Sequence, residues 1–384
     1  MKNLLIGIIL FFLFSCSSNP QNTIARDQEE LLIEKPKINY KLNSLPKDIN
    51  VIYFSNSNIQ TAFPEEVKGL LTNYYSFSKK NKYFPNIKFI NLNVISSCSF
   101  VLNSDAYNFI FFLKESIDNK PYDLCLNRFT NKNVLVVSDF DDNSTLKKFR
   151  RFLVNRNEDK YELIRFMDSY SNFAMIIDNE VTNDKYEIGD FWKKEFKKEV
   201  AEYRTFNEGD YSQDIFTNLL LLEQSFKRKR KLSRLISKEL SHKSRARQDI
   251  DALFLSVSTR EARNLKPALD YSYNEEMEVF LANDWVGDFQ FLKADKDLDG
   301  VISIEIPFML PTPIPIELRA LQNKSRNFAI GYDAFEIVLL TKGARDLSKV
   351  TYKGLTGKIT FRNNDIDRKS KIFKVRNGTY EYLN

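Results

Sequence analysis

Few residues have the types and spacing of a metal-binding or catalytic site. The most suggestive are three alternating carboxylates. Residues 295–300 read Asp-Lys-Asp-Leu-Asp-Gly, which matches the first half of a calcium-binding EF-hand loop. The twelfth position of such a loop should be a bidentate glutamate, but here it is Ile306. Pro307 follows, and a helix cannot continue comfortably through that position. We therefore interpret this segment as an acidic turn before a strand.

The rest of the sequence contains few patterns that are typical of catalytic sites. The single histidine, His242, lies in a basic segment without a serine or cysteine motif nearby. The chain has no Gly-x-Ser-x-Gly motif, no phosphate-binding glycine loop and no Cys/His cluster with metal-ligand spacing. Adjacent carboxylates such as Asp141 and Asp142 are common at surface turns. The sequence therefore predicts a protein that is not an enzyme and needs no cofactor or metal ion.

Positive charge is concentrated in one stretch of the chain. The net charge is only +6, which is too modest for a dedicated nucleic-acid binder. One interpretation of the basic stretch is a solvated helix face. The other is a surface that docks on an acidic partner or on an anionic cell-wall polymer. The candidate partner-binding basic patch comprises Lys227, Arg228, Lys229, Arg230, Lys231, Arg245 and Arg247. Since Arg247, Asp249 and Asp251 share one face at strand spacing, we also expect local ion pairing there.

The N-terminus predicts export and lipid attachment. Lys2 precedes an apolar run, Leu4–Phe14, which is too short to span a bilayer and is typical of a signal peptide. The run ends in Ser15-Cys16, which resembles a bacterial lipobox with Cys16 as the acylated residue, although Phe14 is bulkier than usual. A plain secretory signal is the alternative. Serine rather than aspartate after the cysteine favours the outer membrane, so we expect an anchor on its periplasmic face.

The sequence also predicts the segment that follows the anchor and a possible disulfide between the two remaining cysteines. Residues 1–15 are the expected signal peptide, and residues 16–47 the lipidated cysteine and a flexible tether. Cys98 and Cys125 form an even pair, which in an oxidising periplasm permits a disulfide. Two separate buried thiols remain the alternative.

The clearest local pattern, and the element that would position the charged groups, is the segment 244–270. An apolar run at Ala252–Val257 fits a parallel strand that is covered on both faces. Ser258 and Glu261 then have the spacing of a capping box, in which each side chain accepts a hydrogen bond from the backbone of the other residue. Apolar residues recur on one helical face after that. The pattern predicts a strand, a tight turn and a capped helix.

Strand and helix patterns alternate along the rest of the chain, which indicates an α/β fold with mainly parallel sheets. The number of units indicates two lobes. Expected helices are Phe63–Lys80, Asn143–Asn155, Gly189–Val200, Ser212–Leu240 and Phe328–Thr341. Expected strands are Asn50–Ser55, Asn86–Val94, Asn108–Leu113, Asn133–Ser138, Phe173–Asp178, Tyr203–Phe206, Glu278–Ala282, Gly300–Ile306, Gly354–Phe361 and Ile372–Tyr382.

Several of these segments resemble the LpoA/LppC family of lipoproteins that activate penicillin-binding proteins. The matching strings are Ser244–Leu255 (Ser-Arg-Ala-Arg-Gln-Asp-Ile-Asp-Ala-Leu-Phe-Leu), Ala262–Leu269, Asp297–Val301 with Pro307, Phe328–Ala334 and Gly354–Ile359. The resemblance covers residues from about 170 to 380. Longer members of the family carry an N-terminal helical-repeat domain, whereas here only the expected tether precedes Ile49.

The resemblance implies a two-lobed type I periplasmic-binding-protein-like fold over residues 48–384. Lobe 1 would span about 48–165 plus C-terminal segments, and lobe 2 about 166–305. It also implies a non-enzyme that activates a class A penicillin-binding protein, which is a peptidoglycan synthase. The rival is a periplasmic solute-binding lipoprotein that closes on a small ligand between its lobes. Tyr332 and Asp333 are candidates to face such a cleft, although an aspartate near a helix start more often caps the helix.

Overall fold

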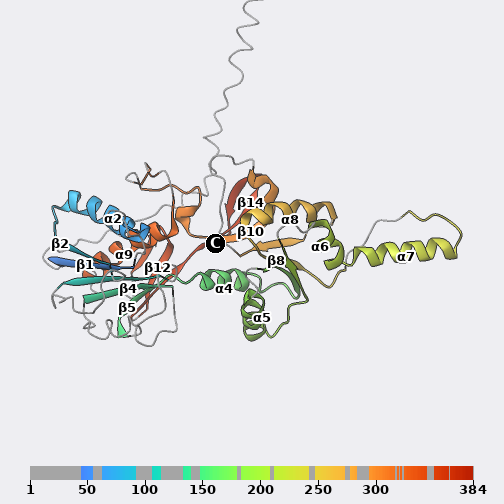
Figure 1. Ribbon diagram of the computed structural model, residues 1–384, viewed down its shortest axis with the longest axis horizontal. Coiled ribbons are helices and arrows are strands. Elements are labelled where there is room, and N and C mark those ends of the chain that lie inside the picture. The colour runs from blue at the N-terminus through green and yellow to red at the C-terminus, as the bar shows by residue number, and fades with distance from the viewer. Residues whose placement is uncertain are drawn as a thin grey trace, which may run out of the picture. The chain divides into compact units, whose positions relative to one another are not determined.

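Two β-sheets flanked by helices organise the chain in a computed structural model (Figure 1). The structure describes residues 45–54, 63–91, 106–113, 133–139, 148–179, 183–207, 212–241, 247–272, 277–282, 294–315, 318–319, 321, 324–343, 350–362 and 364–383. Cys16, Cys98, Cys125 and Arg245 lie outside these residues, as does the expected tether up to residue 44. None of the helices in the described part is both long and apolar enough to cross a bilayer.

The first sheet has eight strands in the order β11-β12-β13-β5-β4-β3-β1-β2. Its strands are β1 (Asp48–Tyr53), β2 (Asn86–Asn91), β3 (Tyr107–Phe112), β4 (Val134–Ser138), β5 (Arg150–Leu153), β11 (Thr351–Gly354), β12 (Gly357–Arg362) and β13 (Asp365–Lys369). The first five strands are parallel to their neighbours, and β13 joins them parallel to β5. The last three form an antiparallel meander. Thus the C-terminal region completes a sheet that the N-terminal region begins.

Helices α2 (Glu65–Asn81) and α9 (Arg326–Gly343) pack against each other beside the first sheet. Their backbones approach closely at two glycines. A Cβ atom added to Gly331 would lie 1.7 Å from the carbonyl oxygen of Glu66, and one added to Gly69 would lie 1.9 Å from that of Phe328. Any larger residue would therefore force the two helices apart. Because α9 is buried along nearly its whole length, it is a core helix rather than the amphipathic one expected from the sequence.

The second sheet has seven strands in the order β15-β14-β10-β9-β8-β6-β7. Its strands are β6 (Phe173–Asp178), β7 (Glu202–Phe206), β8 (Ala252–Ser256), β9 (Glu278–Leu281), β10 (Val301–Glu305), β14 (Lys371–Arg376) and β15 (Thr379–Tyr382). Its helical segments are α4 (Arg156–Phe166), α5 (Asn183–Phe196), α6 (Ser212–Leu219), α7 (Leu222–Leu235), α8 (Thr259–Ser272) and η8 (Ala294–Leu298). The short η9 (Pro307–Met309) follows β10 after Ile306 and packs against α9. Strands β14 and β15 are antiparallel additions to an otherwise parallel sheet.

Strand β8 confirms the prediction for the apolar run at Ala252–Val257. Leu253 and Leu255 pack into one apolar cluster, whereas Phe254 packs into another on the opposite face. The capping box is also confirmed at the start of α8. The backbone N–H of Glu261 donates to Ser258 Oγ at 3.2 Å, and that of Ser258 donates to Glu261 Oε2 at 2.8 Å. The strand–turn–helix unit is therefore central to the second sheet.

The helix expected over Asn143–Asn155 is wrong for its described C-terminal part. Residues 150–153 form β5, which pairs with β4 on one side and β13 on the other. Helix α4 begins only after this strand. Asn155 is its N-cap, because Asn155 Oδ1 accepts a 2.9 Å hydrogen bond from the backbone N–H of Asn157. Pairing with a strand from the far C-terminus overrides the local helical pattern. In addition, Leu163 and Ile164 of α4 pack into a cluster of the second sheet, although the sequence placed the lobe boundary near residue 165.

The long helix expected over Ser212–Leu240 is divided into α6 and α7. Leu221, between the two, has a φ of 56°, which is the left-handed region that a non-glycine residue rarely adopts. Such a residue cannot continue a right-handed helix. The break redirects the chain so that α7 starts a new helix with its own axis.

Candidate functional site

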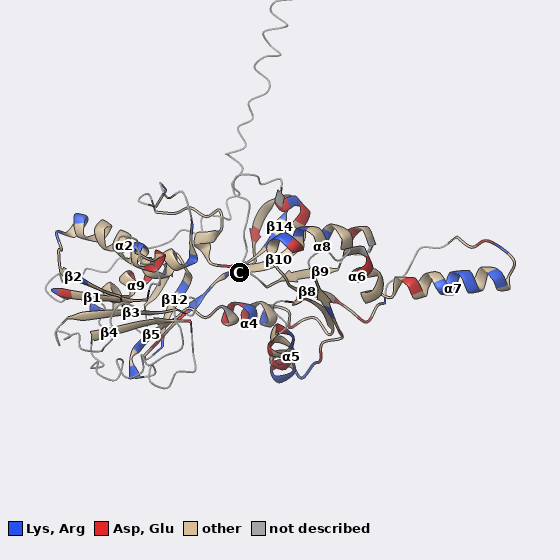
Figure 2. Ribbon diagram, viewed as in Figure 1, with Lys and Arg blue, Asp and Glu red and all other residues tan. Residues whose placement is uncertain are grey.

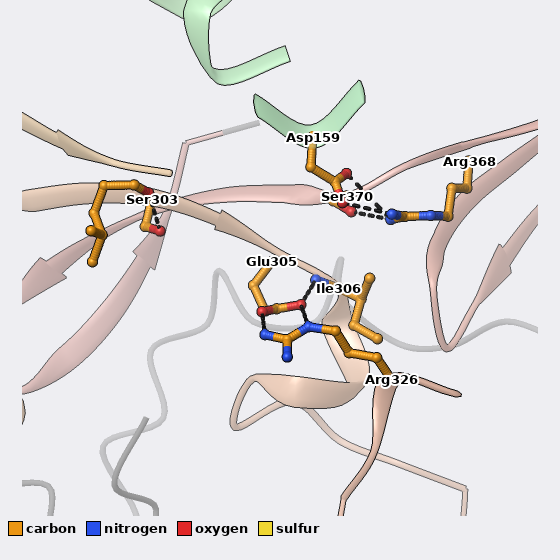
Figure 3. A network of polar contacts seen from close by, with 8 residues as sticks. Asp159, Ser303, Glu305, Ile306, Arg326, Arg368 and Ser370 are labelled. Carbon is orange, nitrogen blue, oxygen red and sulfur yellow. Dashed lines mark hydrogen bonds and ion pairs between the residues drawn. The ribbon is translucent and has the colours of Figure 1, made fainter. Parts of the chain in front are cut away.

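The chain passes between the two sheets three times. Figure 3 shows Ile306 and Ser370, which lie in two of these passages, near Asp159 of α4. One passage joins β5 to α4 at residues 154–155, a second leaves β10 at Ile306, and the third joins β13 to β14 at Ser370. Charged side chains gather around these connections. The charged groups around them are therefore the candidate functional site that the fold positions.

Two ion pairs connect the third passage to α4. Arg368 donates from Nη2 to Asp159 Oδ2 at 2.6 Å and from Nη1 to Oδ1 at 3.3 Å, while Nη1 also donates to Ser370 Oγ at 2.6 Å (Figure 3). The neighbouring Lys369 pairs with Glu162, one helical turn further along α4. The Arg368 side chain is only 6% exposed, whereas that of Lys369 is 54% exposed. Because solvent screens the exposed pair, Arg368–Asp159 is the stronger connection.

A third ion pair lies at the end of β10, where the chain leaves the second sheet. Arg326, the first residue of α9, pairs with Glu305 through Nη2, and its Nε donates to Glu305 Oε1 at 3.0 Å. The backbone N–H of Ile306 donates to the same oxygen at 2.8 Å. Burial raises the pKa of Glu305, while the charge of Arg326 opposes that rise. The negative charge of Asp159 raises this pKa further, so the two ion pairs are electrostatically coupled.

A buried carboxylate within α9 secures the turn between β11 and β12. Asp333 accepts hydrogen bonds from the backbone N–H groups of Leu355 and Thr356 at 3.0 and 2.7 Å. The hydroxyls of Thr356 and Tyr352 donate to it as well. Burial is the largest influence and raises the pKa of Asp333 to about 6, although these donors favour the charged form. The carboxylate therefore ties α9 to the meander of the first sheet.

This geometry corrects the earlier expectation for Tyr332 and Asp333. Both residues are fully buried, in the middle of α9 rather than at its start. Tyr332 packs in an apolar cluster with Phe308 and Phe328. Neither residue is therefore a helix cap or available to a ligand in a cleft.

The acidic turn at residues 295–300 is committed to internal contacts. Asp295 is fully buried, pairs with Arg263 at 2.7 Å and accepts a hydrogen bond from the hydroxyl of Tyr380. Asp299 accepts a 2.6 Å hydrogen bond from the backbone N–H of Asn377. Within the described residues, no group of three or more His, Cys, Asp or Glu side chains could hold a metal ion. These carboxylates therefore act as structural links between η8 and the β14–β15 hairpin.

The basic patch predicted from the sequence is divided by the structure. Arg247 is 17% exposed and is held by Asp249, at 2.6 Å, and by Glu202, at 3.1 Å. These hydrogen bonds raise the pKa of the Arg247 guanidinium, and the expected local ion pairing is confirmed for Asp249. The residues of the run Lys227–Lys231 lie on α7 instead, in an exposed or half-exposed position (Figure 2). A partner role for the patch stays a prediction.

The residues of the passages were not among the candidates found from the sequence. One signal was present: Glu305 is the only charged residue of its strand, and it lies two residues before Pro307. A carboxylate at such a place is buried and needs a partner. The partners themselves lie 21 residues away for Arg326 and 209 residues apart for Asp159 and Arg368, so no local pattern identifies them.

Part of the chain matches a known protein family by sequence. Residues 188–378 match the model of the family described as "LppC putative lipoprotein". No curated protein sequence matches the chain.

Solved structures share the fold at low sequence identity. The C-domain of LpoA from Haemophilus influenzae, described as a regulator of PBP1A, aligns with a TM-score of 0.58 and 12% identity over 88% of this chain and 100% of that domain. Full-length LpoA from the same organism aligns with the same TM-score and 12% identity over 90% of this chain and 60% of its own length. A protein from Rhodospirillum rubrum described as "a putative branched-chain amino acid ABC transporter" gives a TM-score of 0.57 and 13% identity over 88% of this chain and 100% of that one.

These likenesses confirm the predicted fold class of two mainly parallel sheets flanked by helices. The chain spans about 60% of full-length LpoA and the whole of its C-domain. The chain therefore contains an LppC family domain, with the periplasmic-binding-protein-like fold of the LpoA C-domain.

Proposed function

We propose that this chain is a lipoprotein of the outer membrane that binds and activates a class A penicillin-binding protein and thereby regulates peptidoglycan synthesis. The observation that carries the proposal is the LppC family domain, together with the alignment over the entire C-domain of a protein described as a regulator of PBP1A. Cys16 would be acylated and hold the chain at the periplasmic face of that membrane.

The mechanism follows from binding alone and needs no catalytic group. A regulator activates an enzyme if it binds the active conformation more tightly than the inactive one. The polar groups of the three passages are engaged with one another, as the pairs Arg368–Asp159 and Arg326–Glu305 illustrate. This supports a domain that presents a defined surface to its partner rather than one that turns over a substrate.

The test is capture of the synthase from cells that produce the full chain. Crosslinking followed by purification should recover a class A penicillin-binding protein. The matched control is residues 1–47 fused to an unrelated domain, which retains the expected anchor and tether but should recover none. Equal recovery by both would mean that membrane proximity alone explains the association, and recovery by neither would refute the proposal.

A solute-binding lipoprotein is the second candidate, because the Rhodospirillum rubrum protein shares the fold over its whole length. Ligand pockets need convergent polar groups. Tyr332 and Asp333, which were candidates for such a role, are buried and engaged elsewhere. Calorimetric titration with a panel of amino acids tests this alternative, which predicts heat of binding for at least one of them.

A further inference from the structure

Helix α7 stands away from the second sheet for most of its length (Figure 1). Its buried residues are Leu222 and Ser225, both within the first turn. From Phe226 to residue 241 every residue is exposed or half-exposed. At 1.5 Å per residue, the segment from Phe226 to Ile236 extends about 15 Å beyond the packed turn. Only the first turn of α7 therefore packs against the rest of the domain. We call the segment from Phe226 to residue 241, which projects from it, the arm.

Three aliphatic side chains are exposed near the distal end of this arm, on either side of the exposed Arg234. Leu232, Leu235 and Ile236 are 52%, 72% and 53% exposed. Their spacing of three and four residues places them on one side of the helix. Exposed aliphatic side chains that gather in this way on a projecting element are typical of an interaction site. We call these three residues the apolar tip.

Positive charge lies just before the apolar tip. Five consecutive basic residues occupy 227–231, and Figure 2 shows them as a continuous segment along the middle and outer part of α7. Because successive helical residues are about 100° apart, five in a row surround the helix rather than line one face. Lys227 pairs with Glu223 at 2.9 Å, but this pair is exposed, so solvent and salt weaken it. We call residues 227–231 the basic collar.

The order of the basic collar and the apolar tip along the helix axis distinguishes a protein partner from a lipid surface. A groove on a protein covers one face of a helix, so it would leave part of the collar unused or bury charge without a counter-ion. A lipid surface surrounds an inserted tip on all sides. Acyl chains would accept the apolar tip, and anionic headgroups would meet the collar, whose centre lies about 8 Å further back along the helix axis.

We propose that α7 binds an anionic lipid surface, with Leu232, Leu235 and Ile236 inserted below the headgroups and Lys227–Lys231 at the level of the phosphates. This inference is independent of the proposed regulation of a synthase. It gives the collar a lipid partner, whereas the sequence left open a solvated helix face and a surface that docks on a protein or polymer. The ligand class is an anionic phospholipid, bound through its headgroup charge and its acyl chains together.

The test uses the full chain with Cys16→Ala, so that no acyl chain is attached, and a site-specific probe of the tip. Leu235→Trp should shift to shorter emission wavelength on vesicles that contain 30% phosphatidylglycerol, and lipids brominated on their acyl chains should quench it. The matched control is Tyr271→Trp, because Tyr271 in α8 is 77% exposed but distant in sequence from the arm. The native tryptophans are common to both variants.

The role of the collar is tested in the Leu235→Trp chain by charge reversal. Each basic residue near an anionic surface contributes roughly fivefold to partitioning, so Lys229→Glu with Lys231→Glu should weaken lipid binding at least about 25-fold. Lys88→Glu with Lys358→Glu makes the same change of charge at exposed positions on the first sheet and should weaken it less than about twofold.

Three results would overturn the proposal. The first is an emission of Leu235→Trp that vesicles leave unchanged, or that shifts no more than that of Tyr271→Trp. The second is an equal loss of binding in the two charge-reversed chains. The third is loss of captured protein partner in the collar variant while the tip probe remains insensitive to lipid, which would assign α7 to a protein instead.

Discussion

Arg368, near the end of β13, holds Asp159 in the first half of α4 by two hydrogen bonds, the shorter of 2.6 Å. The pair joins a strand of the first sheet to a helix that packs in a cluster of the second. It lies beside the passages through which the chain crosses between the sheets (Figure 3). The first and second sheets are therefore held together by this ion pair as well as by the three segments of chain that pass between them.

Replacement of Arg368 by methionine should lower the free energy of unfolding by roughly 2–3 kcal/mol. This is less than a fully buried pair would lose, because Asp159 is 21% exposed and water can hydrate its carboxylate. Denaturant unfolding measures the change. Lys369→Met is the matched control, since Lys369 is the next residue, pairs with the same helix and is 54% exposed, and it should lose less than about 1 kcal/mol. Equal losses would contradict the assignment.

Removal of Arg326 should make stability depend on pH. Glu305 is 3% exposed, and burial already raises its pKa; without the guanidinium that pKa rises further. A raised carboxyl pKa penalises the folded state at pH values above it, and protonation relieves the penalty below it. Arg326→Met should therefore be about 3–5 kcal/mol less stable than the wild type at pH 8, and the deficit should shrink as the pH falls toward 5.

The second variant for this pair is Glu305→Gln with Arg326→Met, which removes the buried charge. Its stability should return to within about 2 kcal/mol of the wild type and should lack the pH dependence of the single variant. Thermal or denaturant unfolding between pH 5 and 8 measures both. A deficit in Arg326→Met that stays constant over this range would show that the loss of packing, rather than the buried charge, dominates.

The close approach of α2 and α9 should make Gly331 intolerant of any side chain. In Gly331→Ala the new methyl group would meet the backbone oxygen of Glu66, which cannot move without shifting α2. We expect a loss of about 3 kcal/mol or more. Gly189→Ala in α5 is the control, because its methyl group would meet the movable hydroxyl of Tyr203, and it should change stability by less than about 1 kcal/mol. Similar losses in both would contradict the packing described.

Asp333 should give the wild type a slope of stability with pH. Burial raises its pKa from 3.8 to about 6, so between these values the folded state binds the proton more tightly than the unfolded state. The free energy of unfolding should then fall by about 3 kcal/mol as the pH rises from about 4 to about 6, as far as this group is concerned.

The measurement is the difference between the wild type and Asp333→Asn over that range. The asparagine does not titrate, so its profile lacks this contribution. Its amide nitrogen cannot replace the carboxylate oxygen that accepts from a backbone N–H in the wild type, so the substitution should lower stability by about 1–3 kcal/mol throughout. A difference that grows with rising pH would mean that the hydrogen bonds to Asp333 outweigh its burial.

The fold was largely predictable where local pattern and tertiary environment agree. Strand β8 and the capping box at Ser258 and Glu261 illustrate this, because an apolar run and a helix cap both depend on residues that are close together in the sequence. The pattern failed at β5, where pairing with β13 decides the conformation although more than 200 residues separate the two strands. It also failed to locate the break at Leu221, because nothing in that residue type requires a positive φ.

The candidate site was less predictable for the same reason. Each ion pair at the passages joins residues from distant parts of the chain, and a charged residue alone does not reveal its partner. By contrast, the basic collar on α7 was visible in the sequence as five consecutive residues. What required the structure was the exposure of Leu235 and Ile236 beyond it, since a leucine in a helix is more often buried.

The rate of glycan polymerisation by a purified class A penicillin-binding protein, with and without this chain, tests the central claim most directly. The measurement uses the full chain with Cys16→Ala, and Arg368→Met serves as a variant with a weakened connection between the lobes. We expect a faster rate that saturates as the chain is added in excess of the synthase, with a smaller increase for the variant. A rate that does not change at any concentration of the chain would contradict it.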